Sequence, residues 1–257
     1  MDLGIKGRTA LITGGSKGIG LFIAERLAEE GCNLVLVARG LADLEKACQV
    51  LQKFPVDVRI WPADLSQEAS VRAVAAAFPG VDILVNNAGA IQTGTLEEID
   101  DALWRSYWDL KVYGYINLTR AYYTLMKARG RGVIINIIGA AGERMRHDYI
   151  AGTTGNASLM AFTKALGAAS PDHGIRVVGV NPASVLTDKT LISFRKKARE
   201  KFGDEERWQE LTASKPFGRT ITPLEISAVV AFLASDLAGY MSGTVVTVDG
   251  GLLHRHD

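Results

Sequence analysis

Short runs of apolar residues alternate along this chain with longer segments in which apolar residues recur at helical spacing. Strands buried on both faces appear in a sequence as apolar runs, and amphipathic helices cover the faces of such a parallel sheet. The runs that predict strands are residues 9–13, 33–38, 58–63, 82–87, 132–138, 175–180 and 243–249. The pattern therefore predicts an α/β fold, a parallel sheet with helices on both faces.

A single domain spanning residues 1–257 is the simplest interpretation of this alternation, because no Ser/Pro-rich linker interrupts it. Residues 188–217 are the longest departure from the pattern, since they are charged, helical in period and placed between two predicted strands. We expect this segment to be a helical insertion on the substrate side. It would lie over the carboxyl edge of the sheet, where open α/β sheets bind their ligands.

Composition and charge narrow the classes of partner and location. The 257 residues carry a net charge of +1, which gives no reason to expect binding to nucleic acid or to an anionic membrane. No apolar run approaches the ~18 residues of a membrane span. The first strand starts so soon after Met1 that we expect no signal or transit peptide. Two isolated cysteines are typical of a reducing compartment, so the expected location is the cytoplasm.

Metal chemistry is not expected either. The four histidines, at positions 147, 173, 254 and 256, form no metal-ligand spacing with Cys32 or Cys48.

The segment 13–20, "TGGSKGIG", follows the first predicted strand and opens a helix. Gly14 permits a tight turn, Gly18 lets the backbone approach a pyrophosphate, and Gly20 lets helix and strand pack closely. The helix N-terminus supplies amide donors and a positive dipole for phosphates. The alternative is a glycine-rich turn that binds no ligand. Three glycines increase the conformational entropy that is lost on folding, and without a ligand nothing would offset that cost. The turn therefore predicts a dinucleotide site that also includes Ser16, Lys17 and Ile19.

The end of the second predicted strand bears on which dinucleotide is bound. Enzymes that prefer NAD place an acidic residue there to accept from the ribose 2′-hydroxyl. This chain has Ala38 and Arg39 at that point, with Lys17 nearby in the glycine turn. Two cations without a carboxylate favour NADP(H) over NAD(H), whereas the alternative is a pair of solvated surface cations.

Several motifs occur in one order along nearly the whole chain. They are "TGGSKGIG" at 13–20, "ADL" at 63–65, "NNAG" at 86–89, "NPASVLT" at 181–187 and "YMSGTVVTVDGG" at 240–251. Together they resemble the short-chain dehydrogenase/reductase family. The resemblance implies a Rossmann-type, doubly wound, seven-stranded sheet and a homodimer or homotetramer. It further implies that the helices around 102–128 and 156–169 pack against a second subunit.

The same resemblance assigns the remaining cofactor contacts. By analogy, Asp64 faces the adenine, Asn87 and Gly89 contact the central part of the cofactor, and Thr187 contacts the nicotinamide carboxamide. Leu65, Ala88 and Pro182 belong to the same motifs and are expected to line the same site. The Pro-Gly pair that is usual in the family is Pro182-Ala183 here, which is one departure from the pattern.

The catalytic positions depart further. Members of the family work with Asn, Ser, Tyr and Lys, because a carbonyl oxygen that is reduced needs a positioned proton donor. A neighbouring ammonium lowers the pKa of the tyrosine for that purpose. The segment 156–167, "NASLMAFTKALG", matches the family's helix from its lysine onward. In that register Lys111, Gly139, Gly152 and Asn156 stand where Asn, Ser, Tyr and Lys would be.

Other residues near the expected site could transfer the proton. Lys111 could have its pKa lowered by desolvation, and Tyr149 or His147 in the loop 142–149 could act as an acid or base with Lys111 lowering the pKa of the tyrosine. Tyr149 does not restore the family pattern, since the residue four positions later is Thr153. The alternative is a solvated loop and a lysine paired with Asp109 or Glu143.

The two glycines would also leave space beside the nicotinamide. We expect that space to be taken by a bulkier substrate, by ordered water or by a side chain from elsewhere.

Three functions follow from these features. The favoured one is an NADP(H)-dependent oxidoreductase that acts on a small carbonyl or alcohol substrate through non-standard acid/base residues. The alternatives are a dinucleotide-binding sensor or scaffold without redox turnover, and lyase or hydrolase chemistry in the same pocket. The basic run 195–201, "RKKAREK", could attract an anionic group on a substrate, or it could be a solvated helix face followed by acidic residues at 204–206.

Overall fold

The computed structural model of the protein describes residues 2–89 and 91–255. Its centre is a seven-stranded sheet in the order β3-β2-β1-β4-β5-β6-β7, in which every neighbouring pair is parallel. The strands are β1 (Thr9–Thr13), β2 (Asn33–Ala38), β3 (Val58–Pro62), β4 (Ile83–Asn86), β5 (Gly132–Ile137), β6 (Ile175–Pro182) and β7 (Val245–Val248). All seven lie within the predicted runs or extend them by two residues, so the predicted Rossmann-type α/β fold is confirmed.

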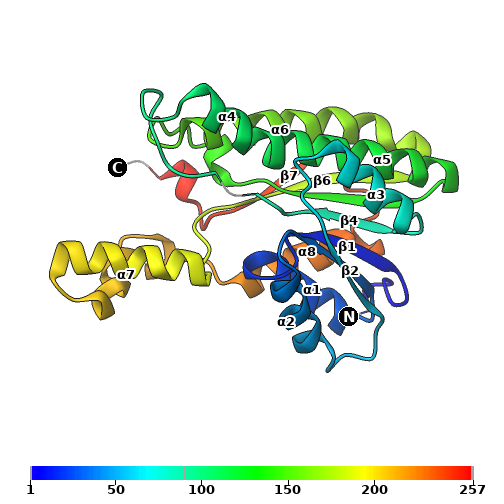
Figure 1. Ribbon diagram of the computed structural model, residues 1–257, viewed down its shortest axis with the longest axis horizontal. Coiled ribbons are helices and arrows are strands. Elements are labelled where there is room, and N and C mark those ends of the chain that lie inside the picture. Colours follow the sequence, from blue (N-terminus) through cyan, green and yellow to red (C-terminus); the bar gives the residue numbers. More distant parts are fainter. Residues whose placement is uncertain (1, 90, 256–257) are drawn as a thin grey trace.

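Helices cover both faces of this sheet (Figure 1). One layer contains α1 (Gly18–Glu29), α2 (Leu41–Leu51) and α8 (Pro223–Ala234). The other contains α3 (Glu68–Ala77), α4 (Asp101–Trp108), the π-helical segment η1 (Asp109–Tyr113), α5 (Gly114–Arg129) and α6 (Ile150–Ala169). Each layer forms its own apolar core with the sheet, because Val, Ile and Leu dominate both faces of the central strands.

Capping residues in the sequence mark where these helices begin. Thr222 caps α8 by accepting from the amide of Glu225, whose carboxylate accepts in turn from the Thr222 amide, and Pro223 occupies the first helical position. Asp100 caps α4 in a similar way by accepting from the Leu103 amide. The short 3-10 turns η2 (Ala140–Gly142), η3 (Ser170–His173), η6 (Asp236–Ala238) and η7 (Leu252–His254) fill the remaining connections.

The segment between β6 and α8 projects from the body of the molecule (Figure 1). It contains α7 (Asp188–Phe202), η4 (Glu205–Thr212) and η5 (Pro216–Gly218), and we call it the α7 lobe. The rings of Phe194 and Trp208 stack at 6.3 Å and hold α7 against η4. The lobe starts where β6 ends, so it adjoins the carboxyl edge of the sheet.

The strand order places a topological switch between β1 and β4, since the chain winds outward in opposite directions from these two neighbours. Open α/β sheets bind ligands in the crevice at the carboxyl ends of the strands beside such a switch. No helix among the described residues is both long and apolar enough to cross a membrane.

Candidate active site

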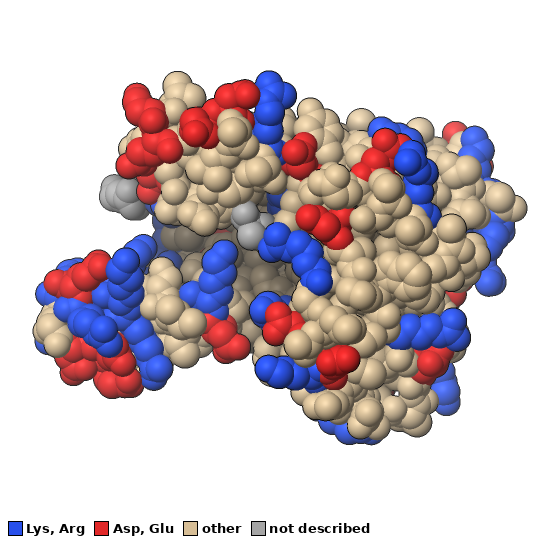
Figure 2. Space-filling model, in the orientation of Figure 1, with Lys and Arg blue, Asp and Glu red and all other residues tan. Residues whose placement is uncertain are grey.

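A cleft of about 630 Å³ lies at the carboxyl edge of the sheet. Its walls come from the turns after β1, β2, β4 and β5, from the end of β6, and from the first residues of α7. Figure 2 shows a hollow between the α7 lobe and the rest of the molecule, with Lys and Arg side chains at its rim. The position is the one that the strand order predicts for a ligand site.

The glycine turn at one end of the cleft has the geometry of a phosphate cradle. Gly14 and Gly18 have φ angles of 64° and 56°, a region that favours glycine. A β-carbon on Gly18 would meet nothing nearer than Thr187 Cγ2 at 3.7 Å, so the backbone of Gly18 faces open space in the cleft. A β-carbon on Gly20 would overlap the carbonyl oxygen of Gly14, which means that Gly20 is needed for close helix packing. The residues present therefore fit the pyrophosphate of a dinucleotide.

Most of the residues predicted to contact the cofactor line this cleft. They are Gly14, Ser16, Lys17, Gly18, Ile19, Arg39, Leu65, Asn87, Ala88, Gly89, Pro182 and Thr187. Gly20 and Asp64 are not among the lining residues, and the Asp64 carboxylate instead accepts from the amide and hydroxyl of Ser66 at 3.0 and 2.8 Å. Asn87 is fixed by bonds from its amide and side chain to Thr13, at 2.8 and 2.9 Å.

The end of β2 has no acidic residue, but a carboxylate from the next helix lies beside Lys17. Asp43, in the first turn of α2, lines the cleft, and its carboxylate accepts from Lys17 Nζ at 2.7 Å. The hydrogen bond and charge of Lys17 lower the pKa of Asp43. Arg39 is exposed beside them. Sequence reasoning missed Asp43 because it belongs to the next helix rather than to the end of β2.

Lys111 lies at the other end of the cleft, within the π-helical segment η1. Its side chain is buried, and Nζ donates to the Ile137 carbonyl at 2.7 Å and to the Tyr115 hydroxyl at 3.0 Å. Burial lowers the pKa of Lys111 from 10.5 to about 7. The alternative that Lys111 forms an ion pair with Asp109 or Glu143 is wrong, because its partners are a carbonyl and a phenol.

The partner Tyr115 was not predicted. It is buried at the start of α5, and its hydroxyl donates to the Ile137 carbonyl at 3.0 Å. Burial raises the pKa of Tyr115 well above its ordinary value. The four-residue spacing between Lys111 and Tyr115 was a usable signal, because residues four apart share a helix face.

Tyr149 fills the space that Gly152 leaves. A β-carbon on Gly152 would overlap Cζ and Cε1 of the Tyr149 ring, so the phenol lies directly against the glycine. Tyr149 precedes α6 and lines the same cleft as Lys111 and Gly139. A side chain from elsewhere, one of the three occupants expected for this space, therefore lies beside Gly152. Gly152 is what allows the ring to lie there.

The expected effect of Lys111 on Tyr149 is wrong. Burial raises the pKa of the Tyr149 phenol, and the charge that opposes this rise is that of Arg146. Lys111 instead donates to Tyr115 and to a backbone carbonyl. Tyr149 is therefore a neutral phenol at physiological pH, able to donate a hydrogen bond.

The other residues of the loop 142–149 are not among those that line the cleft. His147 is exposed, is not among the residues that line the cleft, and lies beside the ion pair of Arg146 with Asp148 at 2.6 Å. Glu143 accepts from Asn181 Nδ2 at 2.6 Å and from Thr247 Oγ1 at 2.9 Å. These bonds anchor the loop to β6 and β7.

The basic run of α7 pairs mainly with acids of its own lobe. Arg195 contacts Glu206 at 3.2 Å, and Arg199 pairs with Glu205. The interpretation of this run as a solvated helix face therefore accounts for these arginines.

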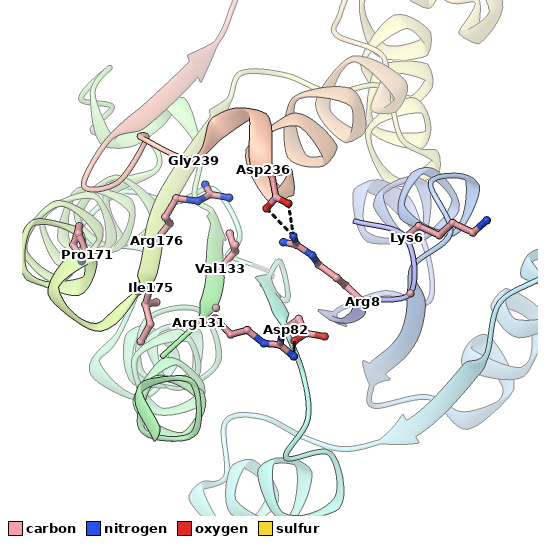
Figure 3. A pocket seen from close by; sticks show the side chains of 13 residues that line it. Lys6, Arg8, Asp82, Arg131, Val133, Pro171, Ile175, Arg176, Asp236 and Gly239 are labelled. Carbon is pink, nitrogen blue, oxygen red and sulfur yellow. Dashed lines mark hydrogen bonds and ion pairs between the residues drawn. The ribbon is translucent and has the colours of Figure 1, made fainter. Parts of the chain in front are cut away.

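A second cavity, of about 550 Å³, lies at the opposite edge of the sheet (Figure 3). Several of its charged side chains are bound to the protein itself. Arg8 pairs with Asp236 at 2.6 Å, and Arg176 donates to the carbonyls of Leu233 and Ser235 at 2.8 and 3.0 Å. Cations at the last carbonyls of a helix stabilise its C-terminus. These contacts indicate a structural role, so the cleft at the carboxyl edge remains the candidate active site. The described residues contain no group of three His, Cys, Asp or Glu side chains arranged to hold a metal ion.

Known proteins resemble this chain over nearly its whole length. Residues 14–253 match the family model described as enoyl-(acyl carrier protein) reductase. Galactitol 2-dehydrogenase (L-tagatose-forming) of Cereibacter sphaeroides is 36% identical over 252 residues, which cover 96% of this chain and 95% of that protein. The 3-oxoacyl-[acyl-carrier-protein] reductase of Vibrio cholerae is 32% identical, with 97% of this chain and 99% of that protein covered.

A solved structure also resembles this chain over its whole length. The L-sorbose reductase of Gluconobacter frateurii, determined in complex with NADPH and L-sorbose, superposes with a TM-score of 0.93 at 36% identity. The match covers 100% of both chains.

Proposed function

Because the chain belongs to the short-chain dehydrogenase/reductase family, we propose that it is an NADP(H)-dependent oxidoreductase that interconverts a small carbonyl compound and its alcohol. One observation carries the proposal. A single cleft joins the glycine cradle of Gly14 and Gly18 to a buried lysine whose pKa lies near neutrality. The relatives named as galactitol dehydrogenase, ketoacyl reductase and sorbose reductase support this class of reaction.

The preference for NADP(H) rests on the two cations at the ribose end. Arg39 and Lys17 both line the cleft where a 2′-phosphate would lie. Asp43 opposes this preference, but it is already paired with Lys17. We therefore infer that Arg39 supplies the free cation. A bidentate guanidinium suits a phosphate better than an ammonium does.

The family's catalytic Asn, Ser, Tyr and Lys are replaced in this proposal. A reduced nicotinamide, when bound, supplies a hydride to the carbonyl carbon of the substrate. The substrate oxygen must then receive a proton as its C=O bond becomes a C–O bond. Lys111 is the donor we assign, because an acid whose pKa is close to the working pH transfers protons most effectively.

The geometry leaves Lys111 free for that role. An ammonium has three N–H donors, and Ile137 and Tyr115 accept two of them. The third is available to the cleft that Lys111 lines. Tyr149 is proposed as a hydrogen-bond donor to the same substrate oxygen rather than as the group that loses its proton, since burial raises its pKa. The proposal gives no step to His147, because that side chain lies outside the cleft lining.

The test is the pH dependence of NADPH oxidation with L-sorbose, L-tagatose, acetoacetyl-CoA and simple ketones. We expect turnover to fall above about pH 7 as the Lys111 ammonium loses its proton. Lys111→Met should remove that inflection and lower turnover by about 100-fold or more. Lys111→Arg keeps the charge but does not release a proton, so it should also lack the inflection. Tyr149→Phe should lower turnover and keep the inflection, and Tyr113→Phe, at an exposed position in η1, is the matched control.

Other functions predict different results in the same experiment. A cofactor sensor or scaffold would bind NADPH, lose binding in Gly18→Asp and show no turnover with any substrate. Lyase or hydrolase chemistry would form product without nicotinamide. Failure to bind either dinucleotide would contradict the proposal altogether.

We also propose that the chain forms a homodimer or homotetramer through α5 and α6 and works in the cytoplasm, with the α7 lobe as the substrate-side part of one domain. Light scattering after size exclusion measures the oligomer.

A further inference from the structure

Tyr115 is a buried side chain to which the function proposed above gives no role. It lies at the start of α5 and is 2% exposed. Its hydroxyl accepts from Lys111 Nζ at 3.0 Å and donates to the Ile137 carbonyl at 3.0 Å. Lys111 Nζ donates to the same carbonyl at 2.7 Å. The ammonium, the phenol and the carbonyl therefore form a closed triangle of hydrogen bonds at the end of β5.

The surroundings of Lys111 make these neutral partners important. Burial lowers the pKa of Lys111 to about 7, and no charge on the described residues contributes to that change. β5 carries no ionisable side chain, and the partly or fully buried ones just before α6 and in α4, Tyr149 and Tyr107, are phenols. The charged residues of α4, η1, α6 and the first half of α5 other than Lys111 are exposed, namely Asp101, Arg105, Asp109, Arg120 and Lys164. Hydrogen bonds to uncharged acceptors are therefore what supports the protonated form of Lys111.

A phenol can bond Lys111 in both protonation states. The ammonium has three N–H donors, of which Tyr115 and Ile137 accept two. The neutral amine has a lone pair, to which the phenol hydroxyl can donate instead. A hydrogen bond from an ionised donor is roughly twice as strong as one between neutral groups, so Tyr115 favours the ammonium. The ring adds to this preference, because Lys111 Nζ lies 4.6 Å from its centroid, within the ~6 Å over which a ring attracts a cation.

We propose that Tyr115 is a positioning residue, which stabilises the protonated form of Lys111 and fixes two of its donors so that the third can reach the cleft. The inference rests on the proposed function, in which Lys111 gives a proton to the substrate oxygen. It deepens that function by naming the residue that sets the pH range of the step. Tyr115 transfers no proton itself, because burial raises the pKa of its phenol well above the ordinary value.

Tyr115→Phe tests this role, because phenylalanine keeps the ring and removes only the hydroxyl. The measurement is a carbon-13 NMR titration of the lysine Cε resonances of the full chain, with Lys111 assigned as the signal that Lys111→Met lacks. In wild type we expect the Lys111 signal to titrate with a midpoint at about pH 7. In Tyr115→Phe the midpoint should be about one pH unit lower, since the ammonium loses a charge-assisted hydrogen bond.

Tyr122→Phe is the matched control. Tyr122 is also buried on α5, and its hydroxyl donates to the carbonyls of Phe78 and Val74 at 3.2 and 3.4 Å rather than contacting Lys111. Removing this hydroxyl should lower the stability of the fold and leave the Lys111 midpoint in place. The comparison separates an effect on Lys111 from a general loosening of α5.

The same variants should differ in the pH profile of NADPH oxidation with L-sorbose, L-tagatose or acetoacetyl-CoA. A midpoint lowered by about one pH unit from about 7 leaves Tyr115→Phe about tenfold below wild type at pH 8 but only about twofold below it at pH 6. Tyr122→Phe should keep the wild-type inflection. A loss of packing alone would lower turnover by the same factor at both pH values.

The outcomes separate this inference from the proposed function. A Lys111 midpoint that is unchanged or raised in Tyr115→Phe, or lowered equally in Tyr122→Phe, would overturn the role of Tyr115. If Tyr115→Phe does not fold, a fluorotyrosine at position 115 keeps the hydroxyl but weakens it as an acceptor, and it should lower the midpoint in the same direction. A wild-type protein that shows the expected titration but oxidises NADPH with none of these substrates would refute the proposed function, while the contact between Tyr115 and Lys111 would be confirmed.

Discussion

Replacing Lys111 by methionine tests the electrostatic basis of the proposed site. Methionine keeps most of the length and apolar body of lysine but carries no charge. The fold lowers the pKa of Lys111 from 10.5 to about 7, which corresponds to up to about 5 kcal/mol of destabilisation at neutral and lower pH. The cause is the burial of an ammonium whose partners, Ile137 O and Tyr115 Oη, are uncharged.

The sign of the pH dependence follows from proton binding. Between about pH 7 and 10.5 the unfolded chain holds a proton on Lys111 that the folded chain has lost. The free energy of unfolding therefore rises with pH across this window. Relative to Lys111→Met, wild-type protein should gain about 2–3 kcal/mol between pH 7 and pH 9.

Urea denaturation of the protein without cofactor, followed by circular dichroism from pH 6.5 to 9, measures this difference. Lys127→Met removes an exposed lysine of α5 and should leave the pH dependence of wild type unaltered. Parallel stability curves for wild type and Lys111→Met would refute the reasoning, because they would mean that the Lys111 pKa is the same in the folded and unfolded chains. The proposal that Lys111 is an acid near neutrality would then lose its physical basis.

Three further changes test other parts of the site. Gly152→Ala should destabilise the fold by about 1–3 kcal/mol through overlap with the Tyr149 ring, and adding Tyr149→Ala should recover most of that loss in urea denaturation. Arg39→Ala should weaken NADPH binding about tenfold with little effect on NADH binding, and Asp43→Asn should tighten NADPH binding. Fluorescence titration measures both effects, which should be larger at low salt.

The fold could be predicted closely from the sequence for a simple reason. A strand buried on both faces must be apolar along its whole length, so runs such as "TALIT" and "GVIINI" mark β1 and β5 without further information. The glycine turn was equally readable, because a positive φ at Gly14 and Gly18 and close packing at Gly20 each require glycine.

Contacts that depend on how side chains from different elements are directed could not be predicted from the sequence. Asp43 reaches Lys17 from a different helix, and no spacing rule connects positions 17 and 43. Tyr149 lies over Gly152 because its backbone leaves the helical region just before α6, with φ of −143° and ψ of 39°. The π-helical segment η1 is a local irregularity that is common at functional sites and has no sequence signature, although the four-residue spacing from Lys111 to Tyr115 could have been read.

These contacts change the meaning of the replaced family positions. In the register that the family resemblance implies, Lys111 and Asn156 stand where the family has its asparagine and its lysine, and we propose that the two residues have exchanged places. The two glycines each leave room for a neighbouring side chain, since Gly152 is covered by Tyr149 and Gly139 adjoins the carboxamide of Asn156. The Tyr149 phenol occupies the side-chain space of Gly152, and Lys111 lines the same cleft, so two hydrogen-bond donors remain there. We propose that the four positions form one rearranged site, in which a lysine, a phenol and an amide are kept and their positions on the chain are changed.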